Sequence, residues 1–220
     1  MSTLTTPTSA TTQVPAGNAR RRAAGLALIA GPLMLVAANL LALGGDTTDP
    51  GYLRRLPAHA GTEQVSILLF IAAFTVLIAG VVGLAGRVTG RGARLAATGS
   101  ALATAGSVGF ACLVVSGVFN IAAAATLPVE QAKTLVDKAG SLPAAAVLVV
   151  LGLLALPIGY ILLAAGAWRA RFTPSWVPLV VFAAFAILTV LDGRVGGIAG
   201  DVVLLVGLGY PGLRLMRDPA

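Results

Sequence analysis

The sequence predicts an all-α membrane protein, a single bundle of about six transmembrane helices. First, hydrophobic residues make up 57% of the 220 residues and charged residues only 10%, whereas a soluble domain carries about 25% charged residues. Second, six apolar stretches approach or exceed the roughly 20 residues that a helix needs to cross a bilayer. Third, basic residues are concentrated in alternate connections between these stretches, which predicts an orientation.

The chain begins with a polar segment, 1–19, that is rich in Thr, Ser and Pro and has no charged side chain. Such a composition predicts a disordered tail, here on the cytoplasmic side. Arg20, Arg21 and Arg22 then precede the first apolar stretch, 23–44. An arginine run followed by an apolar stretch is also typical of a signal peptide, whose apolar core has about 7–15 residues. Because this stretch has 22 residues and further spans follow, we expect it to be retained as the first span.

The other five spans are expected at 65–86, 95–120, 144–168, 176–191 and 196–213. The third lies within a longer apolar run, 95–125, so we expect that helix to be tilted or to extend beyond the bilayer. Pro32, Pro157 and Pro211 lie inside spans, where proline removes a backbone donor and kinks the helix. Residues 20–217 therefore form one transmembrane domain.

The charge distribution predicts which ends of the spans face the cytoplasm. Ten of the 15 basic residues fall on one side: Arg20, Arg21, Arg22, Arg87, Arg91, Arg94, Arg169, Arg171, Arg214 and Arg217. The other five share their side with six of the eight acids. Because Lys and Arg in short loops stay inside, we expect both termini in the cytoplasm. The Arg-, Ala- and Gly-rich composition favours a bacterial chain, and hence the bacterial plasma (inner) membrane.

Two longer connections lie on the side with fewer basic residues. Connection 45–64 is expected to form a short interfacial turn with Tyr52 and Leu56 facing lipid. Within connection 127–142, the apolar residues between Pro128 and Gly140 recur at helical spacing, and Lys133 and Asp137 stand at i,i+4. This pattern predicts an amphipathic helix on the outer surface; the alternative is a simple connector.

Small residues predict how the helices pack. In the third span, Gly99, Ala103, Ser107 and Ala111 form one row, and Ala97, Ala101, Ala105 and Gly109 form another. The fourth span carries a stripe of Gly152, Gly159 and Gly166. Rows of small residues let helices approach closely in lipid. We therefore expect the third span to be central, with internal packing favoured over a homodimer interface.

Asp201 is the main candidate for function, because it lies inside the sixth span and an ionisable residue in a span usually has a role. Its candidate partners are Asn120 near the outer end of the third span, Asn39 in the first span, and Arg194 in the preceding loop. Together with His59, these residues predict a shallow, outward-facing polar pocket. The alternative places Asp201 at the wet outer interface beside Arg194.

His59 and Glu63 stand four residues apart before the second span. On a helix they would share a face and could relay a proton or bind a metal ion. Two side chains are too few for a metal site, so a hydrogen-bonded loop histidine is the simpler interpretation. The sequence has one cysteine, Cys112, and no sequence signature for a cofactor, so none is expected. The net charge of +7 follows from topology, and we expect no nucleic-acid partner.

Several short motifs resemble multipass membrane proteins that are common in actinobacteria and have no assigned activity. These motifs are RRAAGL at 21–26, AHAG at 58–61, RGARL at 91–95, WRAR at 168–171 and PSW at 174–176. The resemblance covers about residues 20–216 and implies a multipass fold without implying a reaction.

Three hypotheses for function follow. The first is a non-enzymatic, small permease-like, accessory or sensor protein that uses the polar pocket. The second is a structural subunit that packs against another membrane protein, or against a second copy of itself, through small-residue helix faces. The third is an intramembrane enzyme, which two or more acids converging on His59 would favour.

Overall fold

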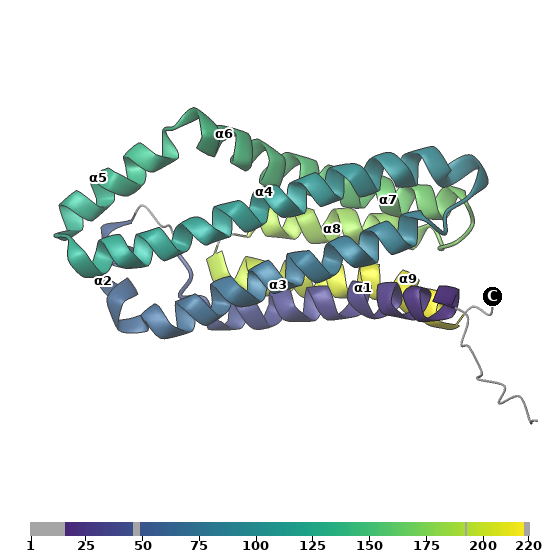
Figure 1. The fold of residues 1–220 in the computed structure, drawn as a ribbon, viewed down its shortest axis with the longest axis horizontal. Helices are drawn as coiled ribbons and strands as arrows, with labels where there is room; N and C mark the ends of the chain where they lie inside the picture. The colour runs from purple at the N-terminus through teal and green to yellow at the C-terminus, as the bar shows by residue number, and fades with distance from the viewer. Residues whose placement is uncertain (1–15, 46–48, 192, 218–220) are drawn as a thin grey trace, which may run out of the picture.

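The computed structural model describes residues 16–45, 49–191 and 193–217, and the regular structure within these ranges is helical (Figure 1). The main helices are α1 (Ala16–Leu41), α2 (Pro50–Arg55), α3 (Ala60–Ala85), α4 (Ala93–Thr126), α5 (Val129–Gly140), α6 (Pro143–Val150), α7 (Leu156–Arg169), α8 (Trp176–Val190) and α9 (Gly193–Arg217). Short turns η1 (Leu56–His59), η2 (Gly90–Gly92) and η3 (Leu151–Ala155) complete the described helical segments. The predicted tail, 1–19, lies outside the described residues except for 16–19, which begin α1.

A helix lies at each of the six expected spans, which confirms the all-α fold of the described chain. Five segments of the described chain are long and apolar enough to cross a membrane: Asn18–Leu41, Pro50–Ala85, Gly90–Thr126, Pro143–Arg169 and Gly193–Arg217. The helix α8 is equally apolar but has 15 residues, a length of about 23 Å at 1.5 Å per residue. The protein is therefore a membrane-embedded helical bundle, and the sixth crossing stays a prediction.

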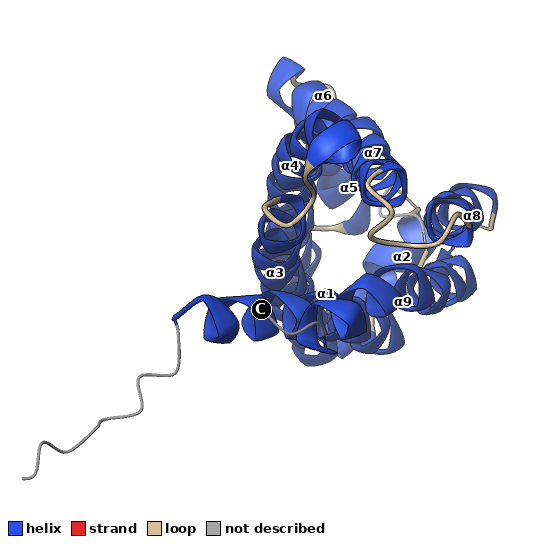
Figure 2. Ribbon diagram, turned by 90° about the vertical axis from the view of Figure 1, so that its right-hand side faces the viewer, coloured by secondary structure: helices blue, strands red, loops and turns tan. Residues whose placement is uncertain are grey.

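The long helices form a closed ring rather than a bundle with a central member. Along the ring, α1 packs on α3, α3 on α4, α4 on α7, α7 on α8, α8 on α9, and α9 returns to α1. Figure 2 shows this ring from one end. The expectation that the third span is central is wrong, because α4 lies within the wall between α3 and α7. Small residues let α4 pack closely against α7, but close packing against one helix does not place α4 at the centre of the bundle.

Glycines allow the backbones of α4 and α7 to touch. A Cβ added at Gly159 would lie 2.2 Å from the Ala103 nitrogen, and one added at Gly99 would lie 2.3 Å from the Leu163 nitrogen. The predicted Gly99–Ala103 row of the third span thus meets the glycine stripe of the fourth, which confirms internal packing. The second row differs, since Ala97 and Ala101 are exposed on the outside of the ring.

The fourth span is interrupted before its proline. The segment α6 continues through the π-helical turn η3 into α7, and Pro157 lies in the first turn of α7. Proline has no N–H for the preceding helical turn, and a π-helical turn widens the helix at such an irregularity. The structure thus has a π-helical turn directly before Pro157, where a kink was predicted, and both lie beside the ring interior.

The ends of the described chain lie at the same end of the bundle, together with the α3–α4 and α7–α8 connections (Figure 1). We call this the terminal end. The guanidinium group of Arg214 lies 5.1 Å from the centre of the Phe172 ring and donates to the Phe172 carbonyl oxygen. These contacts attach the last helix to the α7–α8 connection.

The opposite end, which we call the cap end, carries α2, η1 and α5 (Figure 1). The expectation that Tyr52 and Leu56 face lipid is wrong, because they are 5% and 0% exposed. They pack in an apolar cluster with Leu53, Ile67, Ile121, Ala123 and Ala132. The 34-residue α4 extends far enough to supply part of this cluster. Tyr52 and Leu56 are therefore buried in protein and do not face lipid, because α4 and α5 cover them.

The predicted amphipathic helix is α5. Its Ala132 is fully buried in the cap cluster while Leu135 is exposed, and the Lys133 ammonium lies 2.6 Å from the Asp137 carboxylate. The helix is thus more than a simple connector, since Ala132 and the half-buried Val129 add to the packing of the cap.

Candidate functional site: a cavity inside the helix ring

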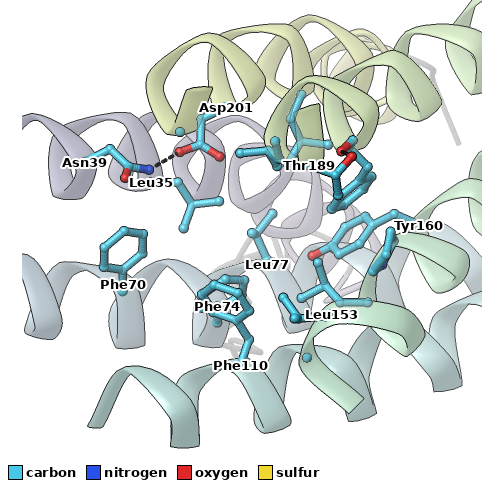
Figure 3. A pocket seen from close by; sticks show the side chains of 17 residues that line it. Leu35, Asn39, Phe70, Phe74, Leu77, Phe110, Leu153, Tyr160, Thr189 and Asp201 are labelled. Atoms are coloured by element: carbon cyan, nitrogen blue, oxygen red, sulfur yellow. Dashed lines mark hydrogen bonds between the residues drawn. The ribbon is translucent and has the colours of Figure 1, made fainter. Parts of the chain in front are cut away.

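A cavity of about 300 Å³ lies inside the ring (Figure 3). Its lining comes from α1, α3, α4, the η3–α7 segment, α8 and α9: Leu35, Asn39, Phe70, Phe74, Leu77, Phe110, Gly152, Leu153, Leu156, Pro157, Tyr160, Phe185, Leu188, Thr189, Gly197, Asp201 and Leu204. Because every ring helix contributes, the cavity exists only in the assembled bundle. Its size is at the lower end of the range for small-molecule sites, roughly 300–1,000 Å³.

Asp201 lies on the wall of this cavity and is 4% exposed. The Asn39 side-chain nitrogen donates to its Oδ2 at 2.7 Å (Figure 3). Asp201 is therefore inside the bundle and not at a wet interface beside Arg194. Of the three candidate partners in the sequence, the structure selects Asn39.

Glycines on α9 allow α1 and α9 to approach closely enough for the hydrogen bond between Asn39 and Asp201. Gly197 lies one helical turn before Asp201, and a Cβ added there would lie 2.7 Å from the Asn39 side-chain oxygen. A Cβ added at Gly200 would lie 2.4 Å from the Leu188 side chain. The glycines before Asp201 thus let α9 sit close to both α1 and α8, which carries the carboxylate into the ring.

Aromatic rings form much of the remaining wall. The ring centres of Phe74 and Phe110 are 5.1 Å apart, and those of Tyr160 and Phe185 are 5.9 Å apart. Both distances fall within the usual range for interacting aromatic pairs. The Tyr160 hydroxyl is buried without a hydrogen bond of standard geometry, and in Figure 3 it points toward the middle of the cavity.

The polar groups of the cavity are few and specific. Among the described residues only Asn39 donates to the Asp201 carboxylate, which has two oxygens and about four acceptor positions. The Thr189 hydroxyl donates to carbonyl oxygens of its own helix. The cavity thus offers one carboxylate with unused acceptor capacity, one phenol, and a large apolar surface. Such a lining can hold a ligand with an apolar body and one donor or positive group.

The other predicted site residues lie outside this cavity. Arg194 donates to the Leu40 carbonyl oxygen at the end of α1, and Asn120 is half-buried near the cap end of α4. The residues predicted to form one outward-facing polar pocket are therefore separated. Asp201 lies inside the ring, whereas Asn120, Arg194 and His59 lie toward the cap end. Their positions along the spans predict similar depths in the membrane. The positions do not show which faces of the helices meet in the folded bundle.

His59 and Glu63 also have separate surroundings. A His59 ring nitrogen lies 3.1 Å from the Arg55 carbonyl oxygen. Glu63 accepts hydrogen bonds from the Leu43 backbone N–H at 2.8 Å and from the Tyr52 hydroxyl at 3.2 Å. Glu63 thus ties the connection after α1 to the cap. In the part of the chain that the structure describes, no three His, Cys, Asp or Glu side chains gather as metal ligands.

Asp201 was predicted from the sequence, but most of the residues that line the cavity with it were not. Asn39 appeared only as one of several partners of Asp201, and Tyr160 and the phenylalanines were not singled out. One sequence feature could have identified Tyr160: it is a tyrosine in the middle of an apolar span, where its hydroxyl needs a polar partner or an open space.

Comparison with protein-family models, with curated proteins and with solved structures gives no match for this chain.

Proposed function

We propose that the protein is a six-span protein of the bacterial plasma membrane with both termini in the cytoplasm. Two observations support this topology. The terminal end groups the chain ends with the two connections that carry Arg87, Arg91, Arg94, Arg169 and Arg171. A cytoplasmic terminal end places ten of the 15 basic residues inside, in agreement with the positive-inside rule. The short α8 crosses as well, with the bilayer thinned locally and Trp176 at the interface of the terminal end.

Within that topology, the protein binds a small ligand inside the membrane as a permease-like or sensor protein. The observation that supports this most is the buried Asp201 on the wall of a 300 Å³ cavity, with Asn39 as its donor. Burying a carboxylate inside a span is costly. A residue of this kind is retained where a ligand, an ion or a proton uses it.

The lining suggests the class of ligand. Phe74, Phe110 and Phe185 present aromatic surface, which attracts cations as well as apolar groups. The Asp201 carboxylate favours a positive or hydrogen-bond-donating group. A compact amine with an aromatic or aliphatic body matches both features and fits the volume of the cavity.

The test uses 2-phenylethylamine as the probe and 2-phenylethanol as its neutral counterpart. Binding to the purified protein is measured by calorimetry and by the shift of the thermal unfolding midpoint, because a ligand of the folded state stabilises it. We expect the amine to bind more tightly than the alcohol, and Asp201→Asn to abolish that preference. An amine that does not bind, or that binds Asp201→Asn equally well, would contradict the proposed ligand class.

A structural role in a membrane complex is the second candidate, and one observation favours it. An open groove on the outside of the ring runs between α3 and α4 and is lined by small residues, including Ala97, Ala101 and Ala105. This is the small-residue row that α7 does not cover. A crosslink formed between cysteines placed at Ala97 and Ala101 in neighbouring copies, in a Cys112→Ala background, would support packing between copies there.

A further inference from the structure

The terminal end contains a second pocket whose chemistry differs from that of the Asp201 cavity. It has a volume of about 220 Å³ and lies between the start of α1 and the end of α3. Three arginines line it: Arg20, Arg21 and Arg87. No acidic residue is among the lining residues. The pocket therefore concentrates positive charge at the terminal end of α1 and α3, whereas Asn39, the partner of Asp201, lies near the other end of α1.

Arg21 gives this pocket its specific character. Its side chain is only 9% exposed, and its Nε and Nη1 atoms are buried without a hydrogen-bond partner among the described residues. Burying a guanidinium group without an acceptor is costly, because the group loses water and gains nothing in return. Both atoms belong to the planar guanidinium group, whose N–H donors suit carboxylate and phosphate oxygens.

The walls of the pocket explain why Arg21 is buried. A Cβ added at Gly83 would lie 2.2 Å from the Ala24 side chain, so α1 and α3 are in close contact beside the pocket. That contact buries Arg21 while Arg20 and Arg87 stay exposed at the rim. The rim arginines attract an anion from solution or from the membrane surface, and Arg21 is positioned to hold it.

We propose that this arginine pocket binds a phosphate group, supplied either by the headgroup of an anionic phospholipid or by free phosphate. The exposed Val82 of α3 lines the same pocket and places it on the outer surface of the ring, where lipid has access. Basic pockets between transmembrane helices are suited to anionic headgroups. The site is independent of the Asp201 cavity and does not depend on its ligand.

The test measures binding of short-chain phosphatidylglycerol to the purified protein by native mass spectrometry, with phosphatidylcholine as the zwitterionic lipid. A parallel titration with inorganic phosphate, at constant ionic strength, follows the thermal unfolding midpoint. Preferential binding of phosphatidylglycerol identifies a lipid headgroup, whereas stabilisation by inorganic phosphate alone identifies a soluble anion. A protein that responds to neither probe overturns the proposal.

Variants locate the binding on the pocket. Arg21→Leu is expected to weaken binding about tenfold, as befits the loss of a charge-assisted hydrogen bond. Arg22→Leu is the matched control, because Arg22 is the exposed neighbour outside the pocket and the change in net charge is the same. Equal loss in both variants would show nonspecific attraction and would overturn the proposal. Arg21→Lys and Arg87→Gln provide milder variants if Arg21→Leu fails to fold, and both are expected to bind more weakly than Arg22→Leu.

Discussion

Asn39 on the first helix donates a 2.7 Å hydrogen bond to Asp201 on the last helix, across 162 positions of sequence. The contact joins the first and last helices at the wall of the cavity. Because Asp201 is buried, the donor does more than link two helices; it satisfies part of the hydrogen-bonding capacity of a buried carboxylate. The folded ring and the candidate site therefore depend on the same pair of side chains.

Removing the donor is expected to destabilise the protein. Asn39→Ala leaves the Asp201 carboxylate without its amide partner, and an unsatisfied buried acceptor costs about 1–3 kcal/mol. Thermal or denaturant unfolding of the purified protein measures this loss. The double variant Asn39→Leu/Asp201→Leu removes both polar groups, and we expect it to be more stable than Asn39→Ala. If Asn39→Ala is as stable as the unaltered protein, the hydrogen bond has no energetic role.

The close packing of α4 on α7 predicts a strong effect of one methyl group. In Gly159→Ala, the new Cβ would lie 2.2 Å from the Ala103 nitrogen, so the helices must separate, at a cost of about 1–3 kcal/mol. Gly209→Ala is the control, since Gly209 also lies within a long helix but has nothing within 4 Å of an added Cβ. It is expected to be neutral or slightly stabilising, because alanine favours helix. Similar unfolding midpoints for the two variants would contradict the backbone contact.

Cysteine labelling in intact cells tests the proposed topology. In a Cys112→Ala background, His59→Cys places a thiol at the cap end and Thr89→Cys places one at the terminal end, and both positions are exposed. A membrane-impermeant thiol reagent is expected to label position 59 in intact cells and position 89 only after permeabilisation. The reverse pattern would invert the orientation, and labelling of both positions in intact cells would contradict an impermeable bundle in the plasma membrane.

Glu63 is expected to hold the cap in place. Glu63→Ala leaves the Leu43 N–H and the Tyr52 hydroxyl without their acceptor, so the connection between α1 and α3 should open more often. Hydrogen exchange in that connection, followed by mass spectrometry, is expected to accelerate. Glu130→Ala removes an exposed acid from α5 and should leave exchange there unchanged. Equal exchange in the two variants would assign Glu63 no role in the cap.

Features that depend on a single helix were predictable from the sequence, whereas features that depend on contacts between distant helices were not. The position of α5, its Lys133–Asp137 pair and the small-residue contact of Gly99 were all predicted, since each follows from spacing along one helix. The burial of Tyr52 was not, because the residues that cover it come from α4 and α5, far along the chain. The enclosure of Arg21 between α1 and α3 was likewise not predictable, since in sequence it is one of three equivalent arginines.

The sequence by itself determined the helical class, the positions of the helices and the grouping of the basic residues, because composition and periodicity act within each segment. Only the tertiary structure decided that six helices close into a ring, that Asp201 faces Asn39 and an aromatic cavity, and that Arg21 is enclosed between α1 and α3. The physical reason is that an apolar membrane helix offers little difference between its faces. Which face meets which neighbour is then set by close packing of small residues from distant parts of the chain.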